Sequence, residues 1–203
     1  MLESDEKNRI LNVASERFLE SGITKVTLDE IAADLGMSKK TVYKFFPSKS
    51  DLLQVIVRML LSHVEREVSS IVNANEPFEK KIARILSLIG RQVRRFSRQF
   101  QIDMQKHSPL LWKEIETFRR ERIFSQVKKM FEQAKREKVF REDLNVDLFY
   151  LVFLSAVQGI MNPKTLSENS FSAEEAFKGI YQTLLEGALT EEAKKRAVYL
   201  DTN

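Results

Sequence analysis

The sequence has 203 residues, of which 43% are hydrophobic and 31% are charged, and its formal net charge is +4. This share of apolar residues is enough for one or two packed cores and excludes a disordered chain. Six glycines and four prolines are too few for the turns of a many-stranded sandwich or barrel, so the composition predicts an all-α protein.

The sequence contains no cysteine, which excludes disulfides, thiolate metal sites and a cysteine nucleophile. The N-terminus, MLESDEKNR, is acidic where a signal peptide would be basic and then apolar. The longest nearly apolar run, Leu148 to Met161, is shorter than the roughly 20 residues of a membrane span. We therefore expect a cytoplasmic protein that does not enter a membrane.

The N-terminal part begins with two predicted amphipathic helices. Ser21-Gly22 ends the first helix, and one face of that helix carries apolar residues at helical spacing, namely Ile10, Val13, Ala14 and Phe18. Thr27 and Glu30 have the spacing of a capping box and open the second helix, which Gly36 ends.

A third, very short helix is predicted to follow, with Ser38 as its cap and Pro47 as its end. A glycine in the link Gly36-Met37-Ser38 permits a sharp left-handed turn, so the second and third helices have helix-turn-helix spacing. We assign residues 1–50 to a three-helix domain and residues 51–203 to a second helical domain.

The rest of the chain predicts further helices and no internal repeat. Apolar stripes, caps and prolines place the expected helices at residues 49–72, 77–93, within 96–107, 109–138, 148–161, 173–189 and within 190–200. Asn162-Pro163 is interpreted as the end of the helix at 148–161.

The positive charge is unevenly distributed. Residues 1–51 hold 8 bases and 9 acids, whereas residues 80–141 hold 18 bases and 6 acids in a pattern typical of solvated helix faces. The segment between Gly36 and Ser50 contains no acid and carries the lysines Lys39, Lys40, Lys44 and Lys49. An exposed basic helix of this size fits the DNA major groove, although a solvated helix face would show the same charges.

Residues 8–55, above all Thr27 to Leu53, resemble the N-terminal domain of the tetracycline-repressor (TetR) family. The resemblance covers the aromatic-rich third helix, the Pro-Ser-Lys junction and the Leu-Leu that begins the next helix. The DNA-binding residues that we assign are Thr27, Ser38, Lys39, Lys40, Thr41, Tyr43, Lys44 and Lys49.

The resemblance also implies individual roles at this interface. Thr27 and Lys49 would contact phosphates, and Ser38 and Lys39 would lie at the edge of the groove. Thr41 and Tyr43 would contact phosphates or bases, as the matching residues do in such proteins. At Lys40 the family more often has a small residue, so Lys40 would add a base contact or another phosphate contact, whereas Phe46 is assigned to the core.

In that family the later helices bind a small effector and pair two chains, so the resemblance implies a homodimer on a palindromic operator. A single helix-turn-helix also makes too few base contacts to define a unique site, which independently favours a dimer. The expected pairing helices are 148–161 and 173–189, although the core of a monomer would explain their apolar character too. Candidate effector contacts are Phe100, Met104, Trp112, Phe118 and Gln158, although residues of this kind are more often plain core than ligand contacts.

The sequence does not favour an enzyme. It has two histidines, His63 and His107, and lacks a nucleophile elbow and a phosphate-binding loop. Asp103 and His107 have the spacing of two metal ligands, but a surface ion pair is the simpler interpretation, so we expect no metal and no cofactor. The predicted function is a ligand-responsive repressor, with a transcriptional activator or a helical adaptor for an acidic protein as alternatives.

Overall fold

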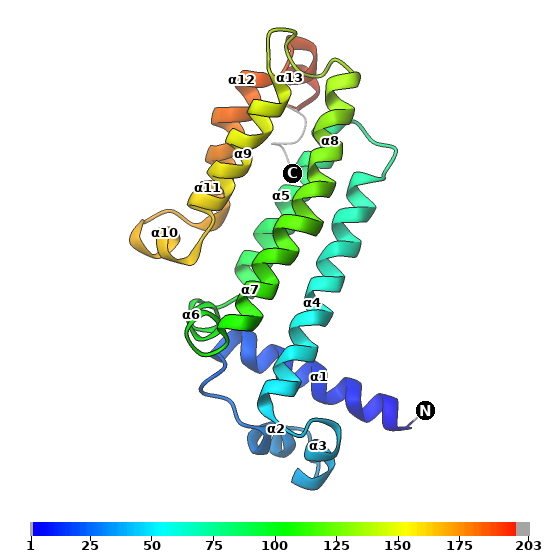
Figure 1. The fold of residues 1–203 in the computed structure, drawn as a ribbon, viewed down its shortest axis with the longest axis vertical. Coiled ribbons are helices and arrows are strands. Elements are labelled where there is room, and N and C mark those ends of the chain that lie inside the picture. Colours follow the sequence, from blue (N-terminus) through cyan, green and yellow to red (C-terminus); the bar gives the residue numbers. More distant parts are fainter. Residues whose placement is uncertain (1, 198–203) are drawn as a thin grey trace. The chain divides into compact units, whose positions relative to one another are not determined.

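The computed structural model describes residues 2–197, so the end of the tail helix expected within 190–200 lies outside the described residues. The described chain is helical, as the composition predicted, and its one β pairing is an isolated antiparallel bridge between Phe140 and Leu189. Figure 1 shows the order of the helices from α1 to α13. The chain divides into two compact units, which are described separately.

The first unit comprises residues 1–64 and 94–118. Its helices are α1 (Leu2–Ser21), α2 (Leu28–Asp34), α3 (Lys39–Phe45), the first part of α4 (Lys49–Val72), α6 (Arg98–His107) and α7 (Pro109–Phe118). All of these helices contribute to one apolar core, whose fully buried members include Ile10, Phe18, Ile31, Val42, Ile56 and Met104. The three N-terminal helices therefore share their core with α4 and α6.

The second unit comprises residues 65–93 and 119–203. Its helices are the rest of α4, most of α5 (Phe78–Arg95), α8 (Phe124–Arg136), α9 (Val146–Ile160), α10 (Pro163–Glu168), α11 (Ala173–Ile180), α12 (Glu186–Ala188) and α13 (Glu191–Ala197). Phe131 lies at the centre of its core and contacts the rings of Phe78, Phe140, Phe149, Tyr150 and Phe153. The ammonium of Lys81 is buried and donates to the carbonyl of Val72 and to Gln133 Oε1, at 2.8 Å each.

The compact units do not follow the predicted division at residue 50, because α6 and α7 pack into the core of the N-terminal helices. The predicted helix at 109–138 is interrupted by the π-helical segment η1 (Arg119–Ile123), and the one at 173–189 by η2 (Tyr181–Leu185). The hydroxyl of Ser125, in the first turn of α8, donates to the carbonyls of Glu121 and Arg122 in η1. A π-helix adds one residue to a turn, a change that a stripe of apolar residues does not reveal.

Two helix boundaries add to what the sequence predicted. The first helix already begins at Leu2, well before the apolar stripe that starts at Ile10. Asn162-Pro163 does not only end α9 but also opens α10, because Asn162 accepts from the amide of Thr165 and Pro163 takes the first helical position. An asparagine cap followed by proline is a start signal as much as a stop signal.

Candidate nucleic-acid interface

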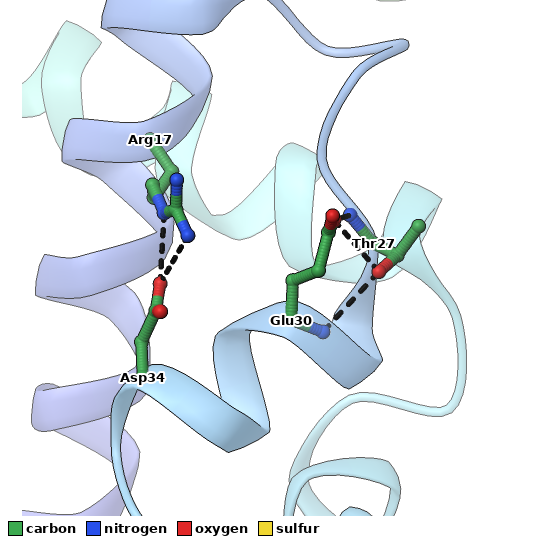
Figure 2. A network of polar contacts seen from close by, with 4 residues as sticks. All are labelled: Arg17, Thr27, Glu30 and Asp34. Atoms are coloured by element: carbon green, nitrogen blue, oxygen red, sulfur yellow. Dashed lines mark hydrogen bonds and ion pairs between the residues drawn. The ribbon is translucent and has the colours of Figure 1, made fainter.

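The residues predicted to bind DNA lie on α2, α3 and the start of α4, and a capping box holds the N-terminus of α2 (Figure 2). The amide of Glu30 donates to Thr27 Oγ1 at 3.2 Å, and both the amide and the hydroxyl of Thr27 donate to Glu30 Oε2 at 2.8 Å. The Thr27 hydroxyl, followed by the Thr27 backbone amide, lowers the pKa of Glu30 through these hydrogen bonds. The single hydroxyl proton of Thr27 is thus committed to Glu30, and the predicted phosphate contact would require an exchange of partners.

An ion pair ties α2 to α1 at the end of α2 opposite to the capping box. Arg17 Nε donates to Asp34 Oδ2 at 2.8 Å, and a second guanidinium nitrogen lies 2.7 Å from the same oxygen (Figure 2). The pair joins the last residue of α2 to the C-terminal part of α1. Together with the buried Ile31, it fixes the orientation of α2 on the first helix.

The turn between α2 and α3 has the predicted left-handed glycine. Gly36 has a φ of 62°, which other residues rarely adopt, and a Cβ at this position would have open space around it. The amides of Gly36 and Met37 donate back to the carbonyls of Ala33 and Ala32. The backbone conformation, rather than crowding, therefore requires glycine here.

The short helix α3 has one buried face and one exposed face. Ser38 caps it by accepting from the amide of Thr41 at 3.1 Å, and the two hydroxyls lie 2.8 Å apart. Val42 and Phe46 are buried in the core of the unit, which confirms the assignment of Phe46 to the core. The exposed residues are Ser38, Lys39, Lys40, Tyr43 and Lys44, and Thr41 is half-buried.

The segment between Gly36 and Ser50 contains no acid, but acidic side chains from other helices reach the basic surface of α3. Lys39 Nζ pairs with Asp29 of α2, and Lys44 Nζ lies 2.8 Å from Glu3 Oε1 of α1. Hydrogen bonding to these carboxylates raises the pKa of both lysines, and hydrogen bonding to Lys44 lowers the pKa of Glu3. Lys40 makes no hydrogen bond or ion pair with the residues that the structure describes.

Lys49, the fourth lysine of this surface, binds backbone. Its ammonium is half-buried at the N-terminus of α4 and donates to the carbonyls of Ile23 and Val26, at 3.1 and 3.0 Å. It thereby holds the link between α1 and α2 on the start of α4. An ammonium has three N–H donors, so one remains for the phosphate contact that the resemblance implies.

The same link is bound from α6 by the buried carboxylate of Asp103. Asp103 Oδ2 accepts from the amide and the hydroxyl of Thr24 at 2.7 and 2.9 Å, and Oδ1 accepts from Gln99 Nε2 at 2.7 Å. Burial opposes ionisation of Asp103, but the bonds from Thr24 and Gln99 outweigh it and lower the pKa of the carboxyl. Sequence reasoning missed this role and paired Asp103 with His107 instead.

Gly22 permits this close approach of α6. Its φ is 87°, and a Cβ here would lie 2.5 Å from Gln99 Cγ and 3.0 Å from Asp103 Oδ2. Gly22 therefore has two reasons to be glycine, the backbone conformation and the lack of space. The only sequence signal was the Ser21-Gly22 helix stop, which does not indicate contact with a segment almost 80 residues away.

The candidate effector residues lie in different surroundings. Phe100 and Met104 are buried in the core of the first unit, and Trp112 packs against that core while half-buried. Phe118 is half-buried at the end of α7, and Gln158 is exposed on α9 of the second unit. Their role in effector binding stays a prediction. Among the side chains that the structure describes, no group of three or more His, Asp or Glu could hold a metal ion.

Helix α9 is apolar on two faces. Phe149, Tyr150 and Phe153 are buried in the second unit. On the other face Leu148 and Leu151 are 58% and 57% exposed, and Val152 is 46% exposed.

None of the helices that the structure describes is long and apolar enough to cross a membrane.

A family model matches the N-terminal part of the chain, and curated relatives match longer stretches of it. Residues 10–56 match the family model "Bacterial regulatory proteins, tetR family". Over 168 residues the chain is 21% identical to the uncharacterized HTH-type transcriptional regulator YvaF of Bacillus subtilis, covering 82% of this chain and 87% of YvaF. It is 26% identical over 140 residues to the nucleoid occlusion factor SlmA of Aliivibrio fischeri, covering 68% and 70% of the two chains.

Solved structures share the fold. A putative transcriptional regulator from Saccharomonospora viridis in complex with choline superposes with a TM-score of 0.73 at 18% identity, covering 93% of this chain and all of that one. A TetR/AcrR-family regulator from Thermobifida fusca superposes with a TM-score of 0.66 at 24% identity, covering 90% and 98%. At these identities the likeness concerns the fold alone.

Proposed function

Because the chain belongs to the TetR family and is a DNA-binding transcriptional regulator, we propose that it is a ligand-responsive repressor that binds a palindromic operator as a homodimer. The observation that carries this proposal is the exposed face of α3, where Lys40 and Tyr43 are held outward by the buried Val42 and Phe46. A rigid helix with polar and basic residues on one side is the element that enters a major groove. We expect no enzymatic activity, and we expect the protein to act in the bacterial cytoplasm, where the chromosome lies.

Selection of genomic fragments on the purified protein, followed by sequencing, tests the DNA-binding part. We expect enrichment of a palindrome whose half-sites are separated by whole helical turns, because two copies of α3 must read the same groove face. Equal retention of all fragments, or a preference for acidic polypeptide over duplex, would contradict the proposal and favour the adaptor alternative. Transcription from the selected promoter, with and without the protein, then distinguishes a repressor from an activator.

The homodimer is supported by α9, on which three neighbouring large apolar side chains, Leu148, Leu151 and Val152, are exposed. A second copy that covers this face would remove Leu148 and Leu151 from water. Light scattering should return twice the mass of the chain. Leu151→Glu should shift the protein towards monomer, whereas Leu110→Glu, which changes a leucine that is 85% exposed on α7, should not. A monomeric wild-type protein would overturn this part.

The effector is proposed to be a small molecule that reduces operator affinity. Support comes from the family and from the bound choline in the Saccharomonospora viridis structure, which concerns that protein only. Screening small molecules for release of the selected duplex would identify it. Gln158→Ala should weaken the response without changing affinity in the absence of effector. Trp112→Ala, which also removes packing from the core of the first unit, should weaken both the response and the operator affinity. If no compound changes operator affinity, the protein is a constitutive regulator.

A further inference from the structure

Two of the three exposed lysines on α3 already have carboxylate partners from other helices. Glu3, in the first turn of α1, reaches Lys44 Nζ at 2.8 Å, and Asp29, in the first turn of α2, pairs with Lys39. Neither acid lies near its lysine in the sequence, so the local charge of α3 overstates what an approaching DNA would meet. Lys40 alone remains without such a partner among the described residues.

The first turn of α1 is held beside α3. The ammonium of Lys7, one turn beyond Glu3, lies 6.0 Å from the ring centroid of the buried Phe46. Lys44, the partner of Glu3, has its Nζ 5.6 Å from the ring centroid of Phe45. Because α1 continues into the core at Ile10, Glu3 is carried by a continuous helix.

A carboxylate at this distance makes the same kind of contact as a phosphate oxygen. Charge-assisted N–H to O bonds to either anion have N to O distances of roughly 2.7–2.9 Å. The Lys44 ammonium keeps N–H donors beyond the one bound to Glu3, but this carboxylate already balances its charge, so a phosphate must compete with Glu3 for Lys44. Both side chains are about two-thirds exposed, at 66% and 68%, so the pair is screened and can open. The result is a reduction of DNA affinity rather than a block.

We propose that Glu3 and Asp29 act as internal counterions, which pair with Lys44 and Lys39, compete with DNA phosphates for these two lysines and thereby lower the affinity for every duplex. This inference rests on the proposed DNA-binding function. Sequence-independent affinity comes almost entirely from lysine and arginine contacts to phosphate. Restraining these two lysines limits non-specific binding and leaves discrimination to the base contacts of α3.

The test measures binding to a random-sequence duplex over a series of salt concentrations, so that no operator is needed. Glu3→Gln removes the charge but keeps the shape of the side chain. Freed Lys44 should then strengthen binding about threefold, the scale of an exposed ion pair. It should also steepen the fall of log K with log salt by up to about 0.9, the value for one phosphate. Asp29→Asn should act in the same direction at Lys39.

The matched control is Glu16→Gln, which makes the same change of net charge at another exposed residue of α1. Glu16 lies 13 positions further along α1, about 20 Å at the rise of an α-helix. A second control repeats Glu3→Gln in a Lys44→Ala background, where the gain should disappear. Far-UV circular dichroism confirms that each variant keeps its helices.

Three results would overturn the assignment. Equal gains from Glu3→Gln and Glu16→Gln would show only an effect of net charge. A gain that persists in the Lys44→Ala background would separate Glu3 from Lys44, and a loss of affinity in Glu3→Gln would mean that Glu3 positions Lys44 for DNA. If the wild-type protein binds no duplex at all, the proposed function fails first, which is a different outcome from binding that Glu3→Gln leaves unchanged.

Discussion

Replacement of Asp103 by alanine should destabilise the protein strongly, because the carboxylate joins α6 to the link between α1 and α2. It accepts three hydrogen bonds in a buried position, two from Thr24 and one from Gln99. Hydrogen bonds to charged groups contribute about 1.5–3 kcal/mol each, and the loss of the acceptor leaves the Thr24 amide in need of a partner. Thr24 is itself exposed, so water can replace the carboxylate as its hydrogen-bond partner and offset part of the lost energy. We therefore expect a loss of about 2–4 kcal/mol in the free energy of unfolding.

Urea unfolding monitored by circular dichroism measures this loss as a shift in midpoint at constant slope. Asp103→Asn keeps one carbonyl acceptor and should cost about half as much. Asp5→Ala, at an exposed position on α1, should change stability by no more than about 0.5 kcal/mol. If Asp103→Ala were as mild as Asp5→Ala, the carboxylate would not hold α6 on the link, and the reasoning would be refuted.

Three further predictions follow from the same unit. Gly36→Ala should lower the free energy of unfolding by about 1–2 kcal/mol because residue 36 has a positive φ. Gly22→Ala should lower it further, because the added Cβ would also collide with Gln99. Equal losses of the two variants in urea unfolding would contradict this. Lys49→Ala should lose about 1–3 kcal/mol with its bonds to the Ile23 and Val26 carbonyls. It should also reduce the salt slope of DNA binding by about 1 if the third donor reaches a phosphate, and an unchanged slope would leave Lys49 a structural role only. Because the hydrogen bonds from Thr24 and Gln99 lower the pKa of Asp103 in the folded state below its ordinary value, the contribution of Asp103 to stability should be fully present above that ordinary value. The contribution should disappear as the pH falls through the folded value, so the stability difference between wild type and Asp103→Asn should narrow in acid, and a constant difference would be inconsistent with this linkage.

The helix-turn-helix could be predicted because its signals are local. The Thr27 and Glu30 capping box, the left-handed Gly36 and the Ser38 cap each act within about four residues, and the structure confirms all three. The buried and exposed faces of α3 could also be predicted from the sequence, since the apolar residues Val42 and Phe46 are spaced to lie on one face of a short helix.

The electrostatic partners could not be predicted, because they connect residues far apart in the chain. Glu3 and Lys44 are separated by 41 positions, and Thr24 and Asp103 by 79. Counting charges within one segment assigned an uncompensated charge to Lys39 and Lys44, which in space face carboxylates from α2 and α1. Lys49 shows the same limit, since a lysine that binds backbone carbonyls cannot be distinguished in a sequence from one that awaits a phosphate.

The central claim is that the exposed face of α3 reads DNA, and Lys40 tests it most directly because it has no partner to release among the described residues. The measurement is the affinity of Lys40→Ala for the selected operator and for a random duplex, beside Lys106→Ala, an exposed lysine on α6. A base contact of about 1–3 kcal/mol predicts that Lys40→Ala weakens operator binding at least about fivefold and random-duplex binding less, with Lys106→Ala unchanged. Operator affinity that is the same for Lys40→Ala and wild type would contradict the claim.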